Sequence, residues 1–304
     1  MFKMSVPSLK SALKKEQIFA PCIYDCISLR AAEVCGYKAA LLSGGALAES
    51  MLGLPDMAFL NIEELVAATQ RICACASIPI IVDGDDGYGE SPAVVYHNVQ
   101  RLIQAGASAI TIEDSTGIRG WERLVQNNWS QQNDLVSEEL WLAKIKAAVE
   151  ACKDTDCMII ARTAAKYTFG LTEAIKRCQK AKAIGADMVL IVGIKTLSDC
   201  QQIGNHISGW KMYPDVMAKN NIPDVELKDI EPYGFQLVTM HYMEKGAMWG
   251  MLEYGVNNLK NQSTVYSESH DMNGYIELSK KRSAAPILEF EEMCQKAGID
   301  CSKN

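Results

Sequence analysis

The sequence has no long hydrophobic run and no leader-like start. None of its apolar stretches approaches the ~18 residues of a membrane-spanning helix. The opening segment, MFKMSVPSLKSALKKEQ, has no apolar core of the kind that a signal peptide carries. We therefore expect a cytoplasmic protein without a membrane partner.

Clusters of positive charge are missing as well. Lys and Arg number 30 against 37 Asp and Glu, for a formal charge of −7, and the charges are dispersed along the chain. A nucleic-acid footprint requires basic clustering, so we exclude a nucleic-acid partner. The 11 cysteines include no CxxC pair and no zinc-like spacing. This pattern favours reduced and mostly buried thiols.

The sequence does contain a repeated alternation of short apolar runs and helical segments. Eight such alternations in 304 residues predict an α/β fold, a (β/α)8 barrel of the TIM type, with a doubly wound sheet as the competing fold. The predicted strands are Ile18–Asp25, Ala39–Gly44, Pro79–Asp83, Ser108–Asp114, Cys157–Thr163, Ala186–Gly193, Trp210–Asp215 and Gly234–His241.

No linker divides the chain into separate domains. We assign residues 1–260 to the barrel and residues 261–304 to a C-terminal helical extension of the same domain, with a final helix over Ala284–Lys296. Helix starts are predicted at the caps Asn61, Ser91 and Ser137. Loops are predicted from Gly44 to Pro55 and over Val216–Pro232, and the long polar segment Ser115–Val136 is a candidate lid.

The densest group of carboxylates follows the third predicted strand, in Asp83-Gly84-Asp85-Asp86-Gly87-Tyr88-Gly89. In an extended chain Asp83 and Asp85 lie on the same side, and Glu113 ends the next strand. These three can converge on Mg²⁺, which takes oxygen ligands, with Mn²⁺ as an alternative. The competing interpretations are a polar turn with solvated aspartates and, for Glu113, a helix cap or a salt bridge to Arg162.

Polar residues also end the other predicted strands, which is where a barrel of this kind has its active site. Ser43-Gly44-Gly45 offers backbone N–H groups to a carboxylate or enolate oxygen, or forms a tight turn. Arg162 clamps a substrate carboxylate or pairs with Glu113 for structural reasons. His241 donates a proton or a hydrogen bond to substrate, or is a structural histidine.

Six motifs, in this order, resemble the isocitrate lyase/phosphoenolpyruvate mutase superfamily. They are Tyr24-Asp25, Leu42-Ser43-Gly44-Gly45, Gly53-Leu54-Pro55-Asp56, Asp83–Gly89, Ile112-Glu113-Asp114 and Ile160-Ala161-Arg162-Thr163. The resemblance implies a Mg²⁺-dependent barrel that acts on α-keto or α-hydroxy carboxylates through an enolate-like intermediate. It also implies a homo-oligomer, a dimer or tetramer, whose subunits exchange their eighth helix, which would suit the C-terminal extension.

The resemblance assigns roles to individual residues. Asp83 is the direct metal ligand, and Asp56, Asp85 and Glu113 act through water. Ser43, Gly44 and Gly45 hold substrate oxygens, and Arg162 holds a carboxylate. We add Tyr24 to the predicted substrate-binding residues, and we predict Asp56, Arg162, His241 and Tyr88 as the catalytic residues.

The segment after Glu113-Asp114 distinguishes the branches of the superfamily. The lyases carry a Lys-Lys/Arg-Cys-Gly-His loop there, whereas this chain has Ser115–Trp121 and no cysteine between Cys75 and Cys152. The Lys-Thr/Ser-Asn loop of phosphoenolpyruvate mutase and phosphonopyruvate hydrolase is absent too. The remaining motifs resemble the oxaloacetate decarboxylase branch. Asp86 departs from the family pattern, and an additional carboxylate beside the metal would disfavour a trianionic substrate.

The sequence therefore predicts a Mg²⁺-dependent carbon–carbon lyase, with decarboxylation of oxaloacetate to pyruvate as the expected reaction. A small α-keto carboxylate is the expected substrate, and the final proton comes from His241, Tyr88 or water. Cleavage or formation of a phosphorus–carbon bond, or a carbon–carbon lyase with an atypical lid, is the alternative. Outside enzymes, the alternative is a non-catalytic metabolite sensor.

Overall fold

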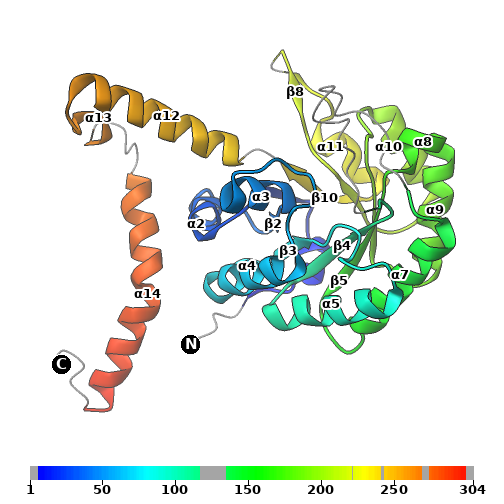
Figure 1. Ribbon diagram of the computed structural model, residues 1–304, viewed down its shortest axis with the longest axis horizontal. Helices are drawn as coiled ribbons and strands as arrows, with labels where there is room; N and C mark the ends of the chain where they lie inside the picture. Colours follow the sequence, from blue (N-terminus) through cyan, green and yellow to red (C-terminus); the bar gives the residue numbers. More distant parts are fainter. Residues whose placement is uncertain (1–5, 117–134, 221, 241–242, 269–273, 299–304) are drawn as a thin grey trace.

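Eight parallel strands form a closed barrel in the order β1-β10-β7-β6-β5-β4-β3-β2. The computed structural model describes residues 6–116, 135–220, 222–240, 243–268 and 274–298 (Figure 1). The predicted α/β barrel is confirmed, and the doubly wound sheet is wrong because β1 pairs with β10 and closes the sheet. The barrel strands are β1 Ile18–Ile23, β2 Ala40–Leu42, β3 Ile80–Asp83, β4 Ala109–Glu113, β5 Met158–Thr163, β6 Met188–Ile191, β7 Lys211–Tyr213 and β10 Phe235–Met240.

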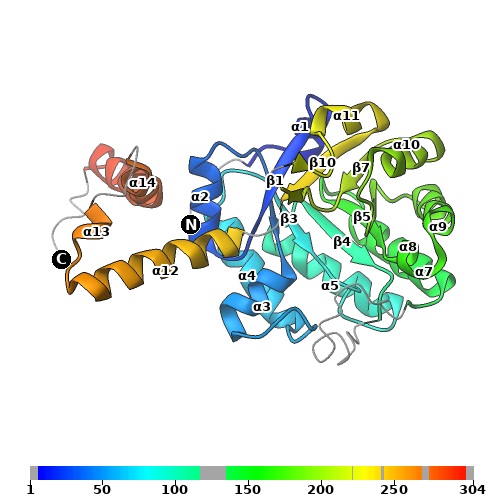
Figure 2. The ribbon, with the colours of Figure 1, turned by 90° about the horizontal axis from the view of Figure 1, so that it is seen from above.

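Helices surround the barrel (Figure 2). The predicted caps Asn61, Ser91 and Ser137 each accept a hydrogen bond from a backbone N–H three residues later, and Pro92 occupies the first turn of its helix. The helices are α1 Leu9–Leu13, α2 Cys26–Val34, α3 Gly44–Leu52, α4 Ile62–Cys75, α5 Pro92–Ala105, α7 Glu138–Ala151, α8 Ala165–Phe169, α9 Leu171–Ala183, α10 Leu197–His206, α11 Leu227–Ile230, α12 Met243–Asn261, α13 Val265–Glu268, α14 Tyr275–Lys296 and the 3₁₀ helix η1 Glu231–Tyr233.

Alternate residues of each strand enter two different cores. One set, which includes Ile81, Ala109 and Ile160, fills the barrel interior, and α1 contributes Leu9 and Leu13 to it. The other set packs between the strands and the helices. Because side chains alternate with a period of two, the interior set continues toward the carboxyl ends of the strands with polar residues. Those residues are Asp83, Thr111, Glu113 and Arg162.

Three predicted irregular or partly helical regions are more regular than expected. The predicted loop after Gly44 is wrong, because Ser43 accepts a hydrogen bond from the Ala46 N–H and begins α3. The prediction of little regular structure over Val216–Pro232 is also wrong. This segment contains the hairpin β8 Ala218–Lys219 and β9 Ile222–Pro223, followed by α11 and η1. The final helix begins at Tyr275 rather than Ala284.

The C-terminal helices form an arm that extends from the barrel (Figure 1). No side chain described in α12 is buried, and the predicted division at residue 260 falls in its last turn. Helix α14 contacts α2, where Arg282 lies 3.9 Å from the buried Glu33 carboxylate. Among the helices of the described ranges, none has the length and apolar character to cross a membrane.

Candidate active site

The predicted site residues gather around two cavities at the carboxyl ends of the barrel strands. The larger cavity has a volume of about 560 Å³, and its walls include Ser43, Gly45, Asp56, Asp83 and Arg162. The smaller one, of about 130 Å³, is lined by Asp85, Tyr88 and Glu113 together with Ala58, Leu60, Asp86 and Ser115. The structure thus brings together residues from the ends of β2, β3, β4 and β5.

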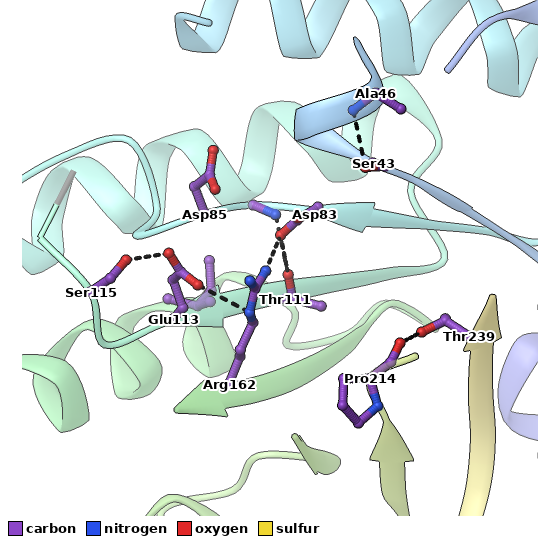
Figure 3. A network of polar contacts seen from close by, with 12 residues as sticks. Ser43, Ala46, Asp83, Asp85, Thr111, Glu113, Ser115, Arg162, Pro214 and Thr239 are labelled. Carbon is purple, nitrogen blue, oxygen red and sulfur yellow. Dashed lines mark hydrogen bonds and ion pairs between the residues drawn. The ribbon is translucent and has the colours of Figure 1, made fainter. Parts of the chain in front are cut away.

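Arg162 lies between the carboxylates of Asp83 and Glu113 (Figure 3). Its guanidinium donates to Asp83 Oδ1 at 3.0 Å, and its Nε lies 3.0 Å from Glu113 Oε2. Burial alone would lower the pKa of Arg162, but the charges of Glu113, Asp83, Asp85 and Asp56 raise it well above its usual range. Arg162 therefore stays charged, and the pairing with Glu113 that the sequence left open is present.

Two hydroxyl groups hold these carboxylates and were missed by the sequence reasoning. The Thr111 hydroxyl donates to Asp83 Oδ1 at 2.9 Å, and the Ser115 hydroxyl donates to Glu113 Oε1 (Figure 3). Thr111 could have been found, because it lies two residues before Glu113 on the same face of β4. Ser115 lies beyond the strand, where alternation gives no guide.

The backbone around Asp85 differs from the extended chain that the sequence argument assumed. Strand β3 ends at Asp83, and Asp85 has φ +44°, in the left-handed region. Both carboxylates nevertheless flank Gly44: a Cβ there would lie 3.6 Å from Asp85 Oδ2 and 4.0 Å from Asp83 Oδ2. The turn therefore brings the two carboxylates close together by a different route. The Tyr88 hydroxyl donates to Asp85 Oδ2 at 3.0 Å.

Asp86 has a different role from the one that the sequence suggested. Its Oδ2 accepts a hydrogen bond from the Lys144 ammonium at 3.2 Å, and the Lys144 side chain is almost completely buried. The charge of Asp86 is therefore offset by a lysine of α7. We expected Asp86 to disfavour a trianionic substrate because it would add an unbalanced negative charge beside the metal. Its pairing with Lys144 removes that reason.

The segment Ser43-Gly44-Gly45 places the beginning of α3 at the larger cavity. Ser43 is the N-cap, and the two glycines begin the first helical turn. The backbone N–H groups that the sequence placed in a loop therefore belong to a helix N-terminus. The positive end of the helix dipole favours an anion at this position. Gly45 also leaves room for Asp56, since a Cβ on Gly45 would lie 3.0 Å from Asp56 Cγ.

Other residues predicted at the strand ends lie outside this cluster. Among the described residues, Tyr24 does not line either cavity, and its N–H donates to the Ser28 hydroxyl at 3.0 Å. Asp25 caps α2 by accepting from the Ser28 N–H at 2.7 Å. Asp114 pairs with Arg177 at 2.9 Å, away from Arg162.

Two further predicted parts of the site lie outside the described residues, namely His241 and residues 117–134 of the candidate lid.

The chemistry of the cluster fits a hard divalent cation. Four negative charges raise the pKa of Arg162, those of Glu113, Asp83, Asp85 and Asp56. Carboxylate oxygens of this kind are the ligands that Mg²⁺ prefers. Within the ranges that the structure describes, no three His, Cys, Asp or Glu side chains already converge as a metal site. Mg²⁺ commonly takes one or two carboxylates and keeps several waters, so a loose set of this kind is sufficient.

Comparison with known proteins shows which family the chain belongs to. A family model described as phosphoenolpyruvate phosphomutase matches residues 9–257. An oxaloacetate decarboxylase of Rhodopseudomonas palustris (strain ATCC BAA-98 / CGA009) is 35% identical over 181 residues. That match covers 60% of this chain and 60% of the relative, so it spans less than two thirds of the relative's length.

Two solved structures have the same fold. Oxaloacetate acetylhydrolase in complex with the inhibitor 3,3-difluorooxalacetate gives a TM-score of 0.80 at 23% identity, over 97% of both chains. A phosphonopyruvate hydrolase complex with oxalate and Mg²⁺ gives a TM-score of 0.76 at 23% identity, over 94% of this chain and 97% of that one. The chain therefore belongs to the phosphoenolpyruvate phosphomutase family, within the phosphoenolpyruvate mutase/isocitrate lyase superfamily of enzymes.

Proposed function

We propose that the chain is a Mg²⁺-dependent decarboxylase that converts oxaloacetate, or a close β-keto acid, to pyruvate and CO₂. The observation that carries this proposal is the group of four carboxylates near Arg162, two of which, Asp83 and Glu113, pair with it at 3.0 Å. They lie beside a cavity that the first turn of α3 lines. The oxaloacetate decarboxylase of Rhodopseudomonas palustris, at 35% identity, supports the choice of reaction.

Asp83, Asp85 and Glu113 would hold the cation, with Asp56 close by against Gly45. Mn²⁺ is the alternative ion, because it takes the same oxygen ligands. When bound, the ion supplies a Lewis acid that polarises the keto group of the substrate. Mg²⁺ accompanies oxalate in the related phosphonopyruvate hydrolase structure.

The chain's own groups bind the negative charges of the substrate. Arg162 exchanges one of its present carboxylate partners for a carboxylate of the substrate, which its planar guanidinium can bind through two hydrogen bonds. The first turn of α3, beginning at Ser43, faces the position where negative charge develops on the C2 oxygen. The helix N-terminus would favour the enolate over the keto form, because charge develops on the C2 oxygen, whereas Arg162 would orient a carboxylate that is charged throughout.

The proposed reaction breaks the C3–C4 bond of oxaloacetate. The C4 carboxylate leaves as CO₂, and the electron pair of the broken bond forms the C2–C3 double bond of the enolate of pyruvate. A proton then adds to C3 as the C2 carbonyl returns. Tyr88 is the described candidate donor, since its hydroxyl is held on Asp85 at 3.0 Å, and His241 or water are the others.

Phosphorus–carbon chemistry is the second candidate, because the matching family model is described as phosphoenolpyruvate phosphomutase. Purified protein with Mg²⁺ should be given oxaloacetate, phosphonopyruvate and a 2-hydroxy acid in parallel. Pyruvate and CO₂ release from oxaloacetate above the protein-free background supports the proposal. Phosphate or phosphoenolpyruvate from phosphonopyruvate alone favours the second candidate. A thermal shift with these acids but no turnover indicates a metabolite sensor, and cleavage of a 2-hydroxy acid indicates an atypical lyase.

We also propose that the chain forms a homo-oligomer, a dimer or tetramer, by exchanging its C-terminal helices. Large apolar side chains of the arm are exposed, including Trp249 at 79%, Leu259 at 72% and Ile287 at 65%. Such a surface is typical of a protein–protein contact. Sedimentation velocity of the full chain and of Trp249→Glu/Leu259→Glu tests this: the double variant should shift to monomer, and a monomeric wild type contradicts the proposal.

A further inference from the structure

The turn of residues 84–88, which follows β3, has an unusual backbone. Asp85 has φ +44°, Gly87 has φ +91° and Tyr88 has φ +54°. Glycine adopts such angles readily, but aspartate and especially tyrosine do so rarely. A conformation of this kind persists only where the surrounding structure holds it. The groups that hold this turn are therefore relevant to the position of Asp85.

Asp86, between the two unusual non-glycine residues, is bound on both sides. Its Oδ1 accepts a hydrogen bond from the Tyr88 N–H at 2.9 Å, and its Oδ2 accepts one from Lys144 Nζ at 3.2 Å. The same ammonium donates to the Asp86 carbonyl at 3.0 Å. Lys144 thus binds both the side chain and the main-chain carbonyl of Asp86.

Lys144 lies on α7, and its position is fixed by packing. The residue is 1% exposed, and Trp141, one turn earlier, donates its indole N–H to the Ile112 carbonyl of β4 at 3.3 Å. A buried ammonium is costly unless a negative charge offsets it, and the Asp86 carboxylate supplies that charge. Asn98 of α5 adds hydrogen bonds to the Gly87 and Tyr88 carbonyls at 3.1 and 3.2 Å.

The turn also connects two of the residues that the proposed function assigns to the cation. The Asp85 carbonyl accepts a hydrogen bond from the Glu113 N–H at 2.7 Å. The Asp85 carboxylate accepts a hydrogen bond from the Tyr88 hydroxyl. The backbone N–H of Tyr88 in turn donates a hydrogen bond to the Asp86 carboxylate. A change at Asp86 is therefore transmitted to the orientation of the Asp85 carboxylate through Tyr88.

We propose that Lys144 and Asp86 are positioning residues, which preset Asp85 for a divalent cation without contacting it. The inference rests on the proposed function for the identity of the ion. Neither the carboxylate of Asp86 nor the ammonium of Lys144 serves as a ligand; Lys144 acts on Asp86, and Asp86 acts on the turn. The carboxylate that departs from the family pattern thus acquires a role through a lysine that is distant in the sequence.

Binding of Mn²⁺ to the purified full chain, measured by electron paramagnetic resonance without substrate, tests this role. We expect the Mn²⁺ dissociation constant to rise 10- to 100-fold in Lys144→Met, as is typical when a group that supports a metal ligand is removed. Asp86→Asn, which keeps its shape and its acceptor for Tyr88, should show a smaller rise. The melting temperature in EDTA shows whether each variant folds.

Lys166→Met is the matched control. Lys166 makes the same kind of double contact, to the Gly193 carbonyl at 2.6 Å and to Asp199 Oδ2 at 3.0 Å. It follows β5, and neither of these partners belongs to the turn of residues 84–88. Its replacement should leave Mn²⁺ affinity within about twofold of the wild type, because this pair touches no residue assigned to the ion.

An unchanged Mn²⁺ affinity in folded Lys144→Met and Asp86→Asn overturns the positioning role, as does an equal loss in the Lys166→Met control. A wild type that binds no Mn²⁺ overturns both the positioning role and the metal dependence of the proposed function. Weakened Mn²⁺ binding in Lys144→Met together with no turnover of any keto acid by the wild type supports the positioning role and contradicts the decarboxylase alone.

Discussion

Replacement of Arg162 by methionine should both destabilise the fold and make the protein more dependent on Mg²⁺. The variant keeps most of the side-chain length but removes the charge that pairs with Asp83 and Glu113. Glu113 is 1% exposed, so its carboxylate would be left buried without this counter-charge. Breaking a buried pair costs about 3–5 kcal/mol, and we take ~3 kcal/mol because the Arg162 side chain is 22% exposed.

In a chain of this size, that loss corresponds to a melting temperature lowered by roughly 5 °C. Thermal unfolding in EDTA measures it. Mg²⁺ should then raise the melting temperature of Arg162→Met more than that of the wild type, because the four carboxylates no longer share a guanidinium. NaCl at the same ionic strength controls for simple screening.

Arg101→Met is the matched control, since Arg101 pairs with Glu63, whose side chain is 72% exposed. Exposed pairs contribute less than about 1 kcal/mol, so this variant should melt close to the wild type and show no additional response to Mg²⁺. If Arg162→Met were as stable as the wild type, or no more sensitive to Mg²⁺, then the carboxylates would not act as one electrostatic cluster and the reasoning would be refuted.

Two further predictions follow from close contacts and from burial. Gly45→Ala should lower turnover about tenfold with little change in stability, because its Cβ would lie 3.0 Å from Asp56 Cγ. Gly250→Ala, whose Cβ has open space, is the control, and equal activity of the two variants would contradict the expected crowding of Asp56. Burial and then the charge of Lys182 lower the pKa of Lys211 from 10.5 to about 8. Between these pH values the unfolded chain binds more protons than the folded chain, so the free energy of unfolding should rise from pH 8 toward pH 10.5, by about 3 kcal/mol at most. Urea denaturation measures this free energy, and Lys211→Met should lack the rise. A parallel pH dependence in wild type and variant would exclude this account of Lys211.

Much of the barrel could be predicted because its signals are local. Short apolar runs gave the eight strands, and the caps Asn61, Ser91 and Ser137 marked helix starts that the structure has. The region after Ser43 was predicted as a loop because it contains Gly44, Gly45, Gly53 and Pro55. Tertiary burial of Ala46 and Leu47 favours the helix there, and composition alone did not reveal it.

The candidate site could be predicted as a set of residues but not as a geometry. Strand alternation and adjacency were sufficient to bring Asp83, Glu113 and Arg162 together. The left-handed backbone at Asp85 depends on contacts made by distant residues, so the extended chain that we assumed there was wrong. The partner of Asp86 could not be predicted either, since the pairing with Lys144 exists only when α7 packs against β4 and α5.

The most direct test of the central claim is the rate of pyruvate formation from oxaloacetate as Mg²⁺ is titrated, with protein-free solution subtracted. The account predicts saturable, Mg²⁺-dependent turnover by the wild type and a fall of at least about 100-fold in Asp83→Ala, which removes the carboxylate shared by Arg162 and the proposed ion. Equal rates in the two proteins, or a wild-type rate that does not exceed the background at any Mg²⁺ concentration, would contradict it.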